Sequence, residues 1–339
     1  MHKNDKIYIL FVIIINMVVE QAKLDLKDKK ILYELDKDCR QTCSQIAKKV
    51  GLSTEVVNYR IKRFEKEEII TQYQVALNLA KMGIVQFKIL LSFQHMTSEK
   101  LDKIIDKLDK NKSVKWIVSC KGNWDLLIAL EAKSLQEIDR VKDEVLSYFQ
   151  GFVNQKAISI CTYAEVYDRD FLVGKSGSDR IRILVSKEKE EKLDEIDMKI
   201  LRQLAENARK PIVDIAFSLK TSARVVNYRI RQLVKRGIIT GFRIALNYEK
   251  LGIQFYKLFI YLDNPEERRF ADLMNYLRHN KNVIHNLKVL GNWDLEPELE
   301  VYSEKEFNSN LQELKDRFSD IIKNIEIVTI EKEHKFVYL

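Results

Sequence analysis

Apolar positions recur with helical spacing in two stretches of the chain that match each other closely. In the first stretch, Val57, Ile61 and Phe64 stand at positions i, i+4 and i+7, and the second stretch repeats this pattern from Val226 to Leu233. Such spacing places the apolar side chains on one face of a helix and leaves the opposite face polar. The pattern therefore predicts two amphipathic helices, which share the sequence VVNYRI.

The similarity extends along the whole chain at a constant offset. Ser53 corresponds to Ser222, an offset of 169 residues, and further identical segments keep the same offset. These segments are 24–25 and 193–194, 76–78 and 245–247, and 122–125 and 291–294. A repeat that keeps one offset without gaps indicates a tandem duplication. We refer to its two copies as the first and the second unit.

Each of these amphipathic helices follows two shorter helical patterns. In the first unit, 25–35 and 42–50 carry apolar residues at helical spacing, and Gly51 ends the second of them as a left-handed residue would. The next helix, 53–64, follows after a short turn, which is the spacing of a helix-turn-helix. The second unit has Lys220 where the first has Gly51, so we expect a strained turn there.

Downstream of each helix-turn-helix, the apolar pattern changes to strands alternating with helices. After extended connectors at 69–77 and 238–246, the first unit follows the order β-α-β-β-α-β, which is the ferredoxin-like arrangement. Its strands are predicted at 87–93, 114–120, 124–131 and 155–162, and its helices at 98–108 and 135–149. The second unit repeats this order from 256 to 330. We therefore predict an α+β fold, a tandem repeat of a winged-helix-like helix-turn-helix domain followed by a ferredoxin-like domain.

These patterns divide the chain into six segments. The segment between the two units contains the sequence GKSGS at 174–178, which is typical of a flexible turn or a hairpin turn. The predicted segments are an N-terminal extension at 1–23, helix-turn-helix domains at 24–71 and 193–240, ferredoxin-like domains at 72–163 and 241–339, and a linker at 164–192.

The N-terminal extension holds an apolar run at 7–19 whose role the sequence leaves open. The run is shorter than the ~20 residues needed to cross a bilayer, so we expect no membrane anchor. It resembles the core of a signal peptide, but Glu20 and Gln21 stand where small cleavage-site residues belong. A strand is a further interpretation. Another is that the protein starts at Met17 and that residues 1–16 do not belong to it.

Basic residues concentrate in the helix-turn-helix segments. The 58 lysines and arginines exceed the 50 aspartates and glutamates by 8, which favours an anionic partner. Between 209 and 236 there are eight basic residues and one acid, and between 40 and 67 there are seven and three. Double-stranded DNA is therefore the expected partner, with more positive charge in the second unit. A solvated charged face without a partner is the alternative.

The polar faces of the two recognition helices supply the candidate DNA contacts. Ser53 and Ser222 occupy N-cap positions, where free N–H groups and the helix dipole can receive a phosphate. The candidates for base edges are Asn58, Tyr59, Asn227 and Tyr228, those for phosphates are Arg60, Lys62, Arg63, Arg229 and Arg231, and Ser53, Thr54, Ser222 and Arg224 complete the set. Alternatively, Arg60 and Arg229 pair with acids inside their own domains.

No residue pattern in the sequence indicates a catalytic or metal site. The cysteines at 39, 43, 120 and 161 have apolar counterparts in the other unit, so we interpret them as small core residues that suit a reducing cytoplasm. The five histidines are scattered, and the sequence contains no phosphate-binding glycine loop or nucleophile elbow. We therefore expect a cytoplasmic protein that is not an enzyme and needs no cofactor or metal.

Four motifs of the first unit recur wholly or in part in the second. In the first unit they are Leu24-Asp25-x2-Asp28-x2-Ile31-Leu32, Ile46-Ala47-x2-Val50-Gly51-Leu52-Ser53, Val57-x2-Arg60-Ile61-x2-Phe64-Glu65 and Gly122-x2-Asp125-Leu126. In this combination the chain resembles the leucine-responsive (Lrp/AsnC) regulator family over nearly its whole length, twice. The resemblance implies a DNA-binding transcriptional regulator whose ferredoxin-like domain dimerises and senses an amino acid or a related small molecule. The implied effector-binding residues are those of the two Gly-x-x-Asp turns, Gly122, Asn123, Trp124, Asp125, Gly291, Asn292, Trp293 and Asp294.

The duplication departs from the pattern of that family, whose members pair two separate chains. The two sheets can therefore pair within the chain as a pseudo-dimer, or copies of the chain can form a homo-oligomer. Fused pairs also resemble sirohaem decarboxylases, which are tetrapyrrole enzymes of the same fold. That alternative requires paired His and Arg residues at the sheet end, where the chain has His285 with Trp116 as its counterpart. A regulator is therefore the expected function.

The strand after the second Gly-Asn-Trp-Asp turn differs from its counterpart in the first unit. Every second residue from Asp294 to Glu300 is acidic, whereas the corresponding face of the first unit is mixed. Four carboxylates cannot be buried without partners, so this face must meet water, a basic surface such as Lys257, or a cationic ligand. Pro297 also removes a hydrogen-bond donor from a strand expected in the sheet centre. A solvated sheet that no longer dimerises and a ligand site are both consistent with this pattern.

Overall fold

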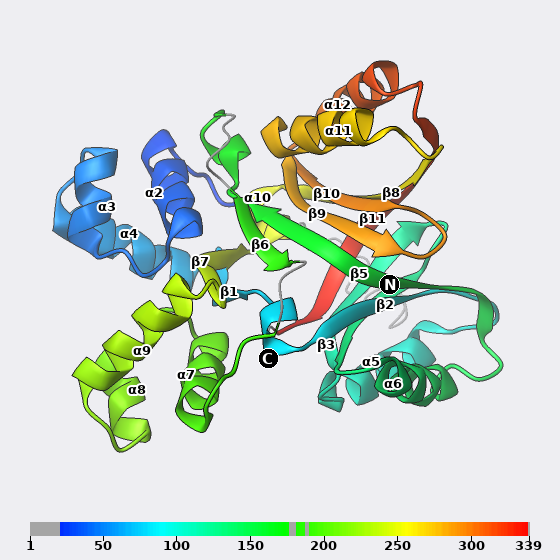
Figure 1. The fold of residues 1–339 in the computed structure, drawn as a ribbon. Coiled ribbons are helices and arrows are strands. Elements are labelled where there is room, and N and C mark those ends of the chain that lie inside the picture. The colour runs from blue at the N-terminus through cyan, green and yellow to red at the C-terminus, as the bar shows by residue number, and fades with distance from the viewer. Residues whose placement is uncertain (1–20, 176–180, 187–189, 338–339) are drawn as a thin grey trace, which may run out of the picture.

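Each unit begins with the three helices and one strand of a helix-turn-helix domain (Figure 1). The computed structural model describes residues 21–175, 181–186 and 190–337. The first unit contains α2 (Leu26–Lys37), α3 (Cys43–Val50), α4 (Thr54–Lys66) and β1 (Ile70–Leu77), and the second contains α7 (Glu195–Glu206), α8 (Ile212–Ser218), α9 (Ala223–Lys235) and β7 (Ile239–Leu246). The recognition helices predicted from the sequence are α4 and α9. The apolar run at 7–19 and the question of residues 1–16 lie outside the described residues.

Local sequence explains where these helices begin and end. The Ser53 hydroxyl accepts the N–H of Val56. The Ser222 hydroxyl accepts the N–H of Val225, so both recognition helices have the predicted N-cap. Gly51 closes α3 with φ +67°. At the equivalent turn Lys220 has φ +51°, a left-handed conformation that strains a residue with a Cβ atom, as expected from the sequence.

The two helix-turn-helix domains are joined by strands that the sequence indicated only as extended connectors. β1 and β7 pair antiparallel, with Tyr73 opposite Ile244. The first helix of each unit packs against the strand of the other unit. The N–H of Cys39 donates to the carbonyl of Phe242, and that of Ala208 donates to the carbonyl of Tyr73. The two helix-turn-helix domains therefore form one intertwined pair.

Both units continue with the predicted β-α-β-β-α-β order. The first has β2 (Val85–Phe93), α5 (Ser98–Lys110), β3 (Val114–Gly122), β4 (Leu126–Ala132), α6 (Leu135–Ser147) and β5 (Val153–Tyr167). The second has β8 (Gln254–Leu262), α11 (Glu267–His279), β9 (Val283–Leu290), β10 (Leu295–Val301), α12 (Glu304–Arg317) and β11 (Ile322–Phe336). Short elements, η1 (Ala80–Met82), η2 (Asp170–Leu172), β6 (Ile181–Val185) and α10 (Tyr248–Leu251), connect them. Among the described residues no helix is both long and apolar enough to cross a membrane.

The two four-stranded sheets close into one barrel. Its strand order is β2-β4-β3-β11-β8-β10-β9-β5, and β5 pairs back to β2. The 15-residue strands β5 and β11 each begin in their own sheet and end in the sheet of the other unit, where β5 pairs with β9 and β11 with β3. The units therefore pair within the chain, which is one of the two arrangements expected from the sequence. The helices α5, α6, α11 and α12 lie outside the barrel (Figure 1).

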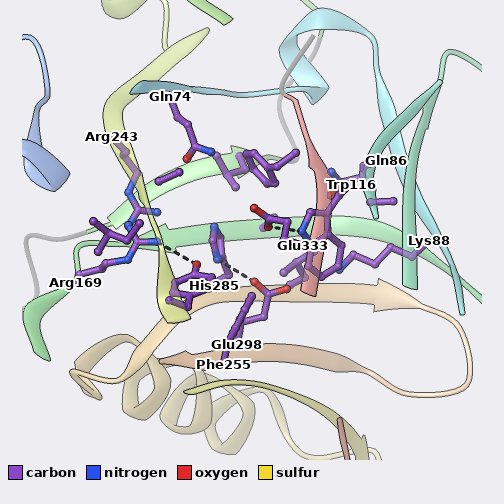
Figure 2. Close-up of a pocket in the computed structure, with 18 residues that line it drawn as sticks. Gln74, Gln86, Lys88, Trp116, Arg169, Arg243, Phe255, His285, Glu298 and Glu333 are labelled. Atoms are coloured by element: carbon purple, nitrogen blue, oxygen red, sulfur yellow. Dashed lines mark hydrogen bonds and ion pairs between the residues drawn. The ribbon is translucent and has the colours of Figure 1, made fainter. Parts of the chain in front are cut away.

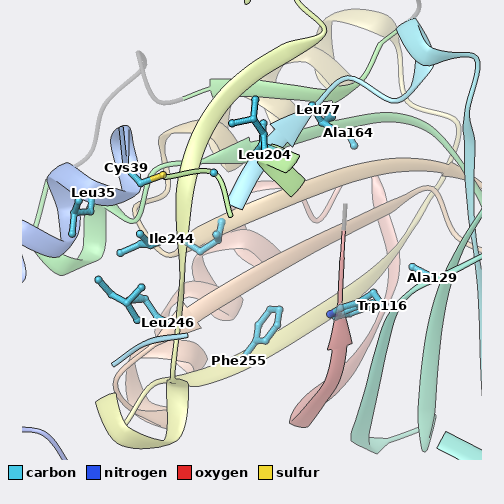
Figure 3. Packing of buried hydrophobic residues seen from close by; sticks show 14 of the residues in the cluster. Leu35, Cys39, Leu77, Trp116, Ala129, Ala164, Leu204, Ile244, Leu246 and Phe255 are labelled. Carbon is cyan, nitrogen blue, oxygen red and sulfur yellow. The ribbon is translucent and has the colours of Figure 1, made fainter. Parts of the chain in front are cut away.

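A continuous apolar core runs from the helix-turn-helix pair into the barrel (Figure 3). Leu35 of α2 and Leu204 of α7 belong to the same buried cluster as Trp116 of β3 and Phe255 of β8. Cys39, Cys120 and Cys161 are buried and Cys43 is half-buried, all of them as free thiols. Each sheet also packs its outer face against its own two helices in a separate cluster.

The segment that we expected to be a linker is partly structural. β5 continues through Tyr167, and Arg169 is buried at 4% exposure. Its guanidinium donates to Asp36 of α2 at 2.7 Å and to Glu300 of β10 at 2.8 Å. Asp36 also accepts from Arg243 of β7 at 3.0 Å. β5 thus runs past the boundary that we placed at 163, and these residues of the linker segment join the helix-turn-helix pair to the barrel. Of the glycine–serine turn, 176–178 lie outside the described residues.

Candidate DNA-binding surface and effector region

The two recognition helices turn their polar faces outward. They lie at one side of the molecule, away from the barrel helices (Figure 1). Tyr59 is 68% exposed and Tyr228 is 60% exposed, although both residues are aromatic. Asn58 is exposed and Asn227 is half-buried beside them. An exposed aromatic and an amide at the same helical positions in both units are the features of a contact surface rather than of a core.

The arginines in the middle of these helices have partners inside the protein. Arg60 Nη1 lies 2.7 Å from carboxylate oxygens of both Asp25 and Asp28, and its hydrogen bond holds the pKa of Asp25 below the ordinary value. Arg229 pairs in the same way with Asp194 and Asp197 of the second unit. In each unit one aspartate caps the first helix, and the other is nearly buried. The buried carboxylate needs a cation beside it.

These pairs change the assignment of phosphate contacts. Arg63 also pairs with Asp28, at 2.8 Å, while Gln232 stands at its counterpart position. The internal pairs that the sequence offered as an alternative for Arg60 and Arg229 are therefore present, and Arg63 forms a further one. Lys62, Arg224 and Arg231 are exposed. The predicted set is thus reduced to Ser53, Thr54, Asn58, Tyr59, Lys62, Ser222, Arg224, Asn227, Tyr228 and Arg231.

The sequence-based set missed two exposed features near these helices. Glu55 is exposed at the second position of α4, where its counterpart in α9 is Arg224. In α8 the apolar side chain of Phe217 is 85% exposed, whereas the first unit has Lys48 at that position. A comparison of the two units residue by residue could have identified both, because each breaks the symmetry of the repeat.

The Gly-x-x-Asp turns stabilise the barrel. The carboxylate of Asp125 accepts the N–H of Phe93 at 2.7 Å, and that of Asp294 accepts the N–H of Leu262 at 2.8 Å. Gly122 has φ +130°, and a Cβ atom there would lie 2.5 Å from the carbonyl oxygen of Ile327. Only glycine permits this close crossing of β3 and β11.

The remaining residues of the two turns are divided between the barrel interior and its surface. Trp124 and Trp293 are buried, with ring centroids 6.4 Å apart. Gly291 lies close to the backbone of β5. A Cβ atom added at Gly291 would lie 3.0 Å from the carbonyl oxygen of Ile158. Asn123 and Asn292 line an open cleft of about 760 Å³ between the two units. Of the eight predicted effector residues, Asn123, Trp124 and Asn292 line this cleft, whereas Asp294 lines a separate pocket beside α11.

The acidic face of β10 is neutralised inside the barrel. Lys257 Nζ lies 2.9 Å from Glu296 and 2.8 Å from Glu298, and Lys88 of the first unit lies 2.5 Å from Glu296. Burial alone would raise the pKa of Glu296, but the charges of Lys257 and Lys88 outweigh it and hold the pKa below its ordinary value. Of the three environments that the sequence allowed for this face, the structure shows the basic surface at Lys257, and the interpretation as a solvated sheet that no longer dimerises is wrong.

Pro297 is tolerated within this strand. On the β8 side, the described pairs include Leu295 with Ile260 and then Glu298 with Lys257, with no pair at Pro297. The ladder with β8 is thus interrupted at the proline, which has no N–H to donate, whereas on the other side Pro297 stands opposite Asn286 of β9. The prediction that β10 is a central strand is compatible with the proline for this reason.

A small polar cavity lies between the β1–β7 pair and the barrel (Figure 2). Its volume is about 100 Å³, and its lining includes Lys88, Arg169, Arg243, His285, Glu298 and Glu333. Most of these charges already have partners: Arg169 pairs with Asp36 and Glu300, and His285 Nδ1 lies 2.9 Å from Glu298. Burial lowers the pKa of His285. Among the described residues no group of three or more metal-ligating side chains is gathered.

Comparison with known proteins gives matches to both the domains and the whole architecture. A winged helix-turn-helix DNA-binding family matches residues 24–71 and 193–240. The HTH-type transcriptional regulator Ptr1 of Methanocaldococcus jannaschii is 32% identical over 102 residues, which are 30% of this chain and 68% of that protein. The HTH-type transcriptional regulator LrpA of Pyrococcus horikoshii is 29% identical over 128 residues, 38% of this chain and 89% of that protein.

Some solved structures match both units at once. The crystal structure of the siroheme decarboxylase NirDL covers 92% of this chain and 93% of its own, with a TM-score of 0.58 and 13% sequence identity. At that identity the match shows a shared fold.

Proposed function

This chain belongs to the Lrp/AsnC family of transcriptional regulators, two units of which it carries in tandem, and we propose that it regulates transcription by binding duplex DNA through both recognition helices. The observation that carries the proposal is the pair of N-capped helices whose exposed faces present the same Asn-Tyr sequence. Because the proposed partner is chromosomal DNA, we propose a cytoplasmic location for this protein.

The exposed side chains divide into base readers and phosphate contacts. Asn58 and Asn227 can form the paired hydrogen bonds by which asparagine recognises adenine in the major groove. Lys62 and Arg231 stand one turn further along each helix and supply exposed positive charge for phosphates. The free N–H groups at each capped helix start add further phosphate contacts. Arg60 and Arg229 have a supporting role, because they fix each recognition helix to the first helix of its domain.

Replacing both Asn58 and Asn227 with alanine should reduce sequence preference without abolishing binding. Each lost base contact is expected to reduce discrimination by ~1–3 kcal/mol, while phosphate contacts maintain non-specific affinity. Competition binding with selected and scrambled duplexes measures the ratio of the affinities for the two kinds of duplex. Asn275→Ala, an exposed site on α11, is the matched control. Equal discrimination by the double variant and the wild type would remove this assignment.

We further propose that an amino acid or a related small molecule binds in the cleft between the two turns. The support is the accessibility of Asn123 and Asn292, which face the cleft from different units, together with the family membership. Isothermal calorimetry with the twenty amino acids should detect heat from at least one of them. Asn123→Ala and Asn292→Ala should each reduce the affinity for that amino acid about tenfold, as expected for one lost hydrogen bond. An unchanged response in both variants would place the effector elsewhere.

A tetrapyrrole enzyme is the second candidate, and the shared fold with siroheme decarboxylase is the observation that favours it. The cavity at the sheet end holds about 100 Å³, whereas pockets for drug-sized ligands have ~300–1,000 Å³. Its lining combines Glu298 and Glu333 with the cations Lys88, Arg169 and Arg243, and each of these cations is already paired with a carboxylate of the protein. Of the paired His and Arg residues expected for that chemistry, the cavity holds Arg169 and Arg243. Its histidine, His285, comes from one unit and has Trp116 as its counterpart in the other. The geometry therefore supports the regulator better.

A further inference from the structure

The two recognition helices are alike in the middle and different at their ends. Both contain VVNYRI, but the residue at the second helical position is Glu55 in α4 and Arg224 in α9. Both side chains are exposed. In helix-turn-helix proteins the N-terminal residues of the recognition helix contact base edges. The two helices therefore present opposite charges at equivalent reading positions.

Charge balance inside the barrel ensures that unlike units pair. Lys88 and Lys257 occupy equivalent positions in the two units, but Glu296 and Glu298 of the second unit correspond to Leu127 and Ala129 of the first. All four charged side chains are buried, at 6% exposure or less.

No pairing of like units would preserve this balance. Two first units would bury two lysines with no carboxylate from these positions, and two second units would bury four carboxylates with two lysines. Only the first with the second gives two cations and two anions, and an unpaired buried charge is strongly destabilising. A functional pair of recognition helices is thus always one α4 and one α9.

On the basis of the proposed function, we propose that the operator of this protein is not a palindrome but two unlike half-sites. The half-sites share the bases read by Asn58 and Asn227 and differ at the base read by the second helical position. Arginine pairs with guanine through O6 and N7, and glutamate accepts from the amino group of cytosine. The half-site under α9 therefore carries guanine at the position where the half-site under α4 carries cytosine.

The state of Glu55 fits this role. Its own backbone N–H, followed by the Ser53 hydroxyl, lowers the pKa of the Glu55 carboxyl, so it is an acceptor at neutral pH. Phosphates repel a carboxylate that lies beside the DNA backbone. The carboxylate contributes favourably to binding only where a base offers it a hydrogen-bond donor. Cytosine is the base that offers one in the major groove without an adjacent ring acceptor.

Selection of bound sequences from a random duplex library by the full-length chain tests the inference. The wild type should select two half-sites with a common core and the cytosine–guanine difference. Glu55→Arg should change the cytosine of the first half-site to guanine, so that the selected motif becomes a palindrome. This variant should bind the palindrome about ten- to hundredfold more tightly than it binds the wild-type site. Arg224→Glu should convert the second half-site to cytosine. Asp106→Arg, which makes the same charge change on the exposed face of α5, should leave the motif unchanged.

The possible results separate this inference from the proposed function. A palindromic wild-type motif, or a Glu55→Arg variant that binds more tightly with no change of preferred base, would overturn the inference and leave DNA binding intact. Failure to enrich any sequence, together with no affinity for duplex DNA, would overturn the proposed function as well.

Discussion

Replacing Glu296 with leucine, the residue at the equivalent position of the first unit, should destabilise the chain by about 3–5 kcal/mol. Glu296 is fully buried and lies 2.5 Å from Lys88 and 2.9 Å from Lys257. Its removal leaves Lys88 buried without this carboxylate and reduces the partners of Lys257 to Glu298. Chemical denaturation of the wild type and the variant measures the difference in the free energy of unfolding.

A second substitution tests whether charge balance causes the effect. Lys88→Met added to Glu296→Leu removes one cation with one anion and should recover most of the lost stability, because a balanced buried pair is often replaceable by apolar residues. Glu331→Leu on β11 is the control. Glu331 pairs with Lys121 at the surface, so its loss should cost less than about 1 kcal/mol. A Glu296→Leu variant as stable as the control would contradict the role of charge balance in pairing the units.

Replacing Arg169 with leucine should destabilise the chain by a similar amount, about 3–5 kcal/mol. The arginine is the link between Asp36 in the first helix-turn-helix domain and Glu300 in the barrel. Arg169→Lys should recover only part of the loss, because a single ammonium group cannot reproduce the forked hydrogen bonds to two carboxylates. Unfolding transitions by denaturant give both values. A Leu variant within about 1 kcal/mol of the wild type would show that this connection is dispensable.

The same variant should change the acid stability of the protein. Burial tends to raise the pKa of Asp36, but the charges of Arg243 and Arg169 lower it to about 2. Because this folded-state pKa lies below the ordinary value of 3.8, the carboxylate stabilises the fold above about pH 4 and loses that contribution as the pH falls toward 2. The contribution is roughly 2–3 kcal/mol at neutral pH. The stability difference between the wild type and Arg169→Leu should therefore shrink between pH 4 and pH 2, and a difference independent of pH would contradict the assignment to Asp36.

Local features of the fold could be predicted because they depend on residues close in sequence. The N-caps at Ser53 and Ser222, the left-handed Gly51 and the order of strands and helices all follow from short-range patterns. The partner of each strand does not, since a period of two indicates which faces are buried but not what covers them. The pairing of β1 with β7, and of the ends of β5 and β11 with the opposite sheet, became visible only in three dimensions.

The candidate site shows the same limit. For Arg60 and Arg229 the sequence left phosphate contact and internal pairing both open. Their partners Asp25, Asp28, Asp194 and Asp197 lie more than thirty residues earlier in the chain. A helical pattern cannot distinguish an exposed arginine from one that reaches across to another helix. The acidic face of β10 was visible in the sequence, but only the closed barrel brings Lys88 of the first unit against Glu296.

The most direct test of the central claim, that both units bind duplex DNA together, is the salt dependence of that binding. Full-length chain would be titrated with a duplex selected from genomic fragments at several salt concentrations. Two recognition helices acting together predict that the logarithm of the association constant falls with the logarithm of salt concentration with a slope of about −4 or steeper, as expected for about five or more phosphate contacts. Binding that is absent, or that does not change with salt, would contradict the claim.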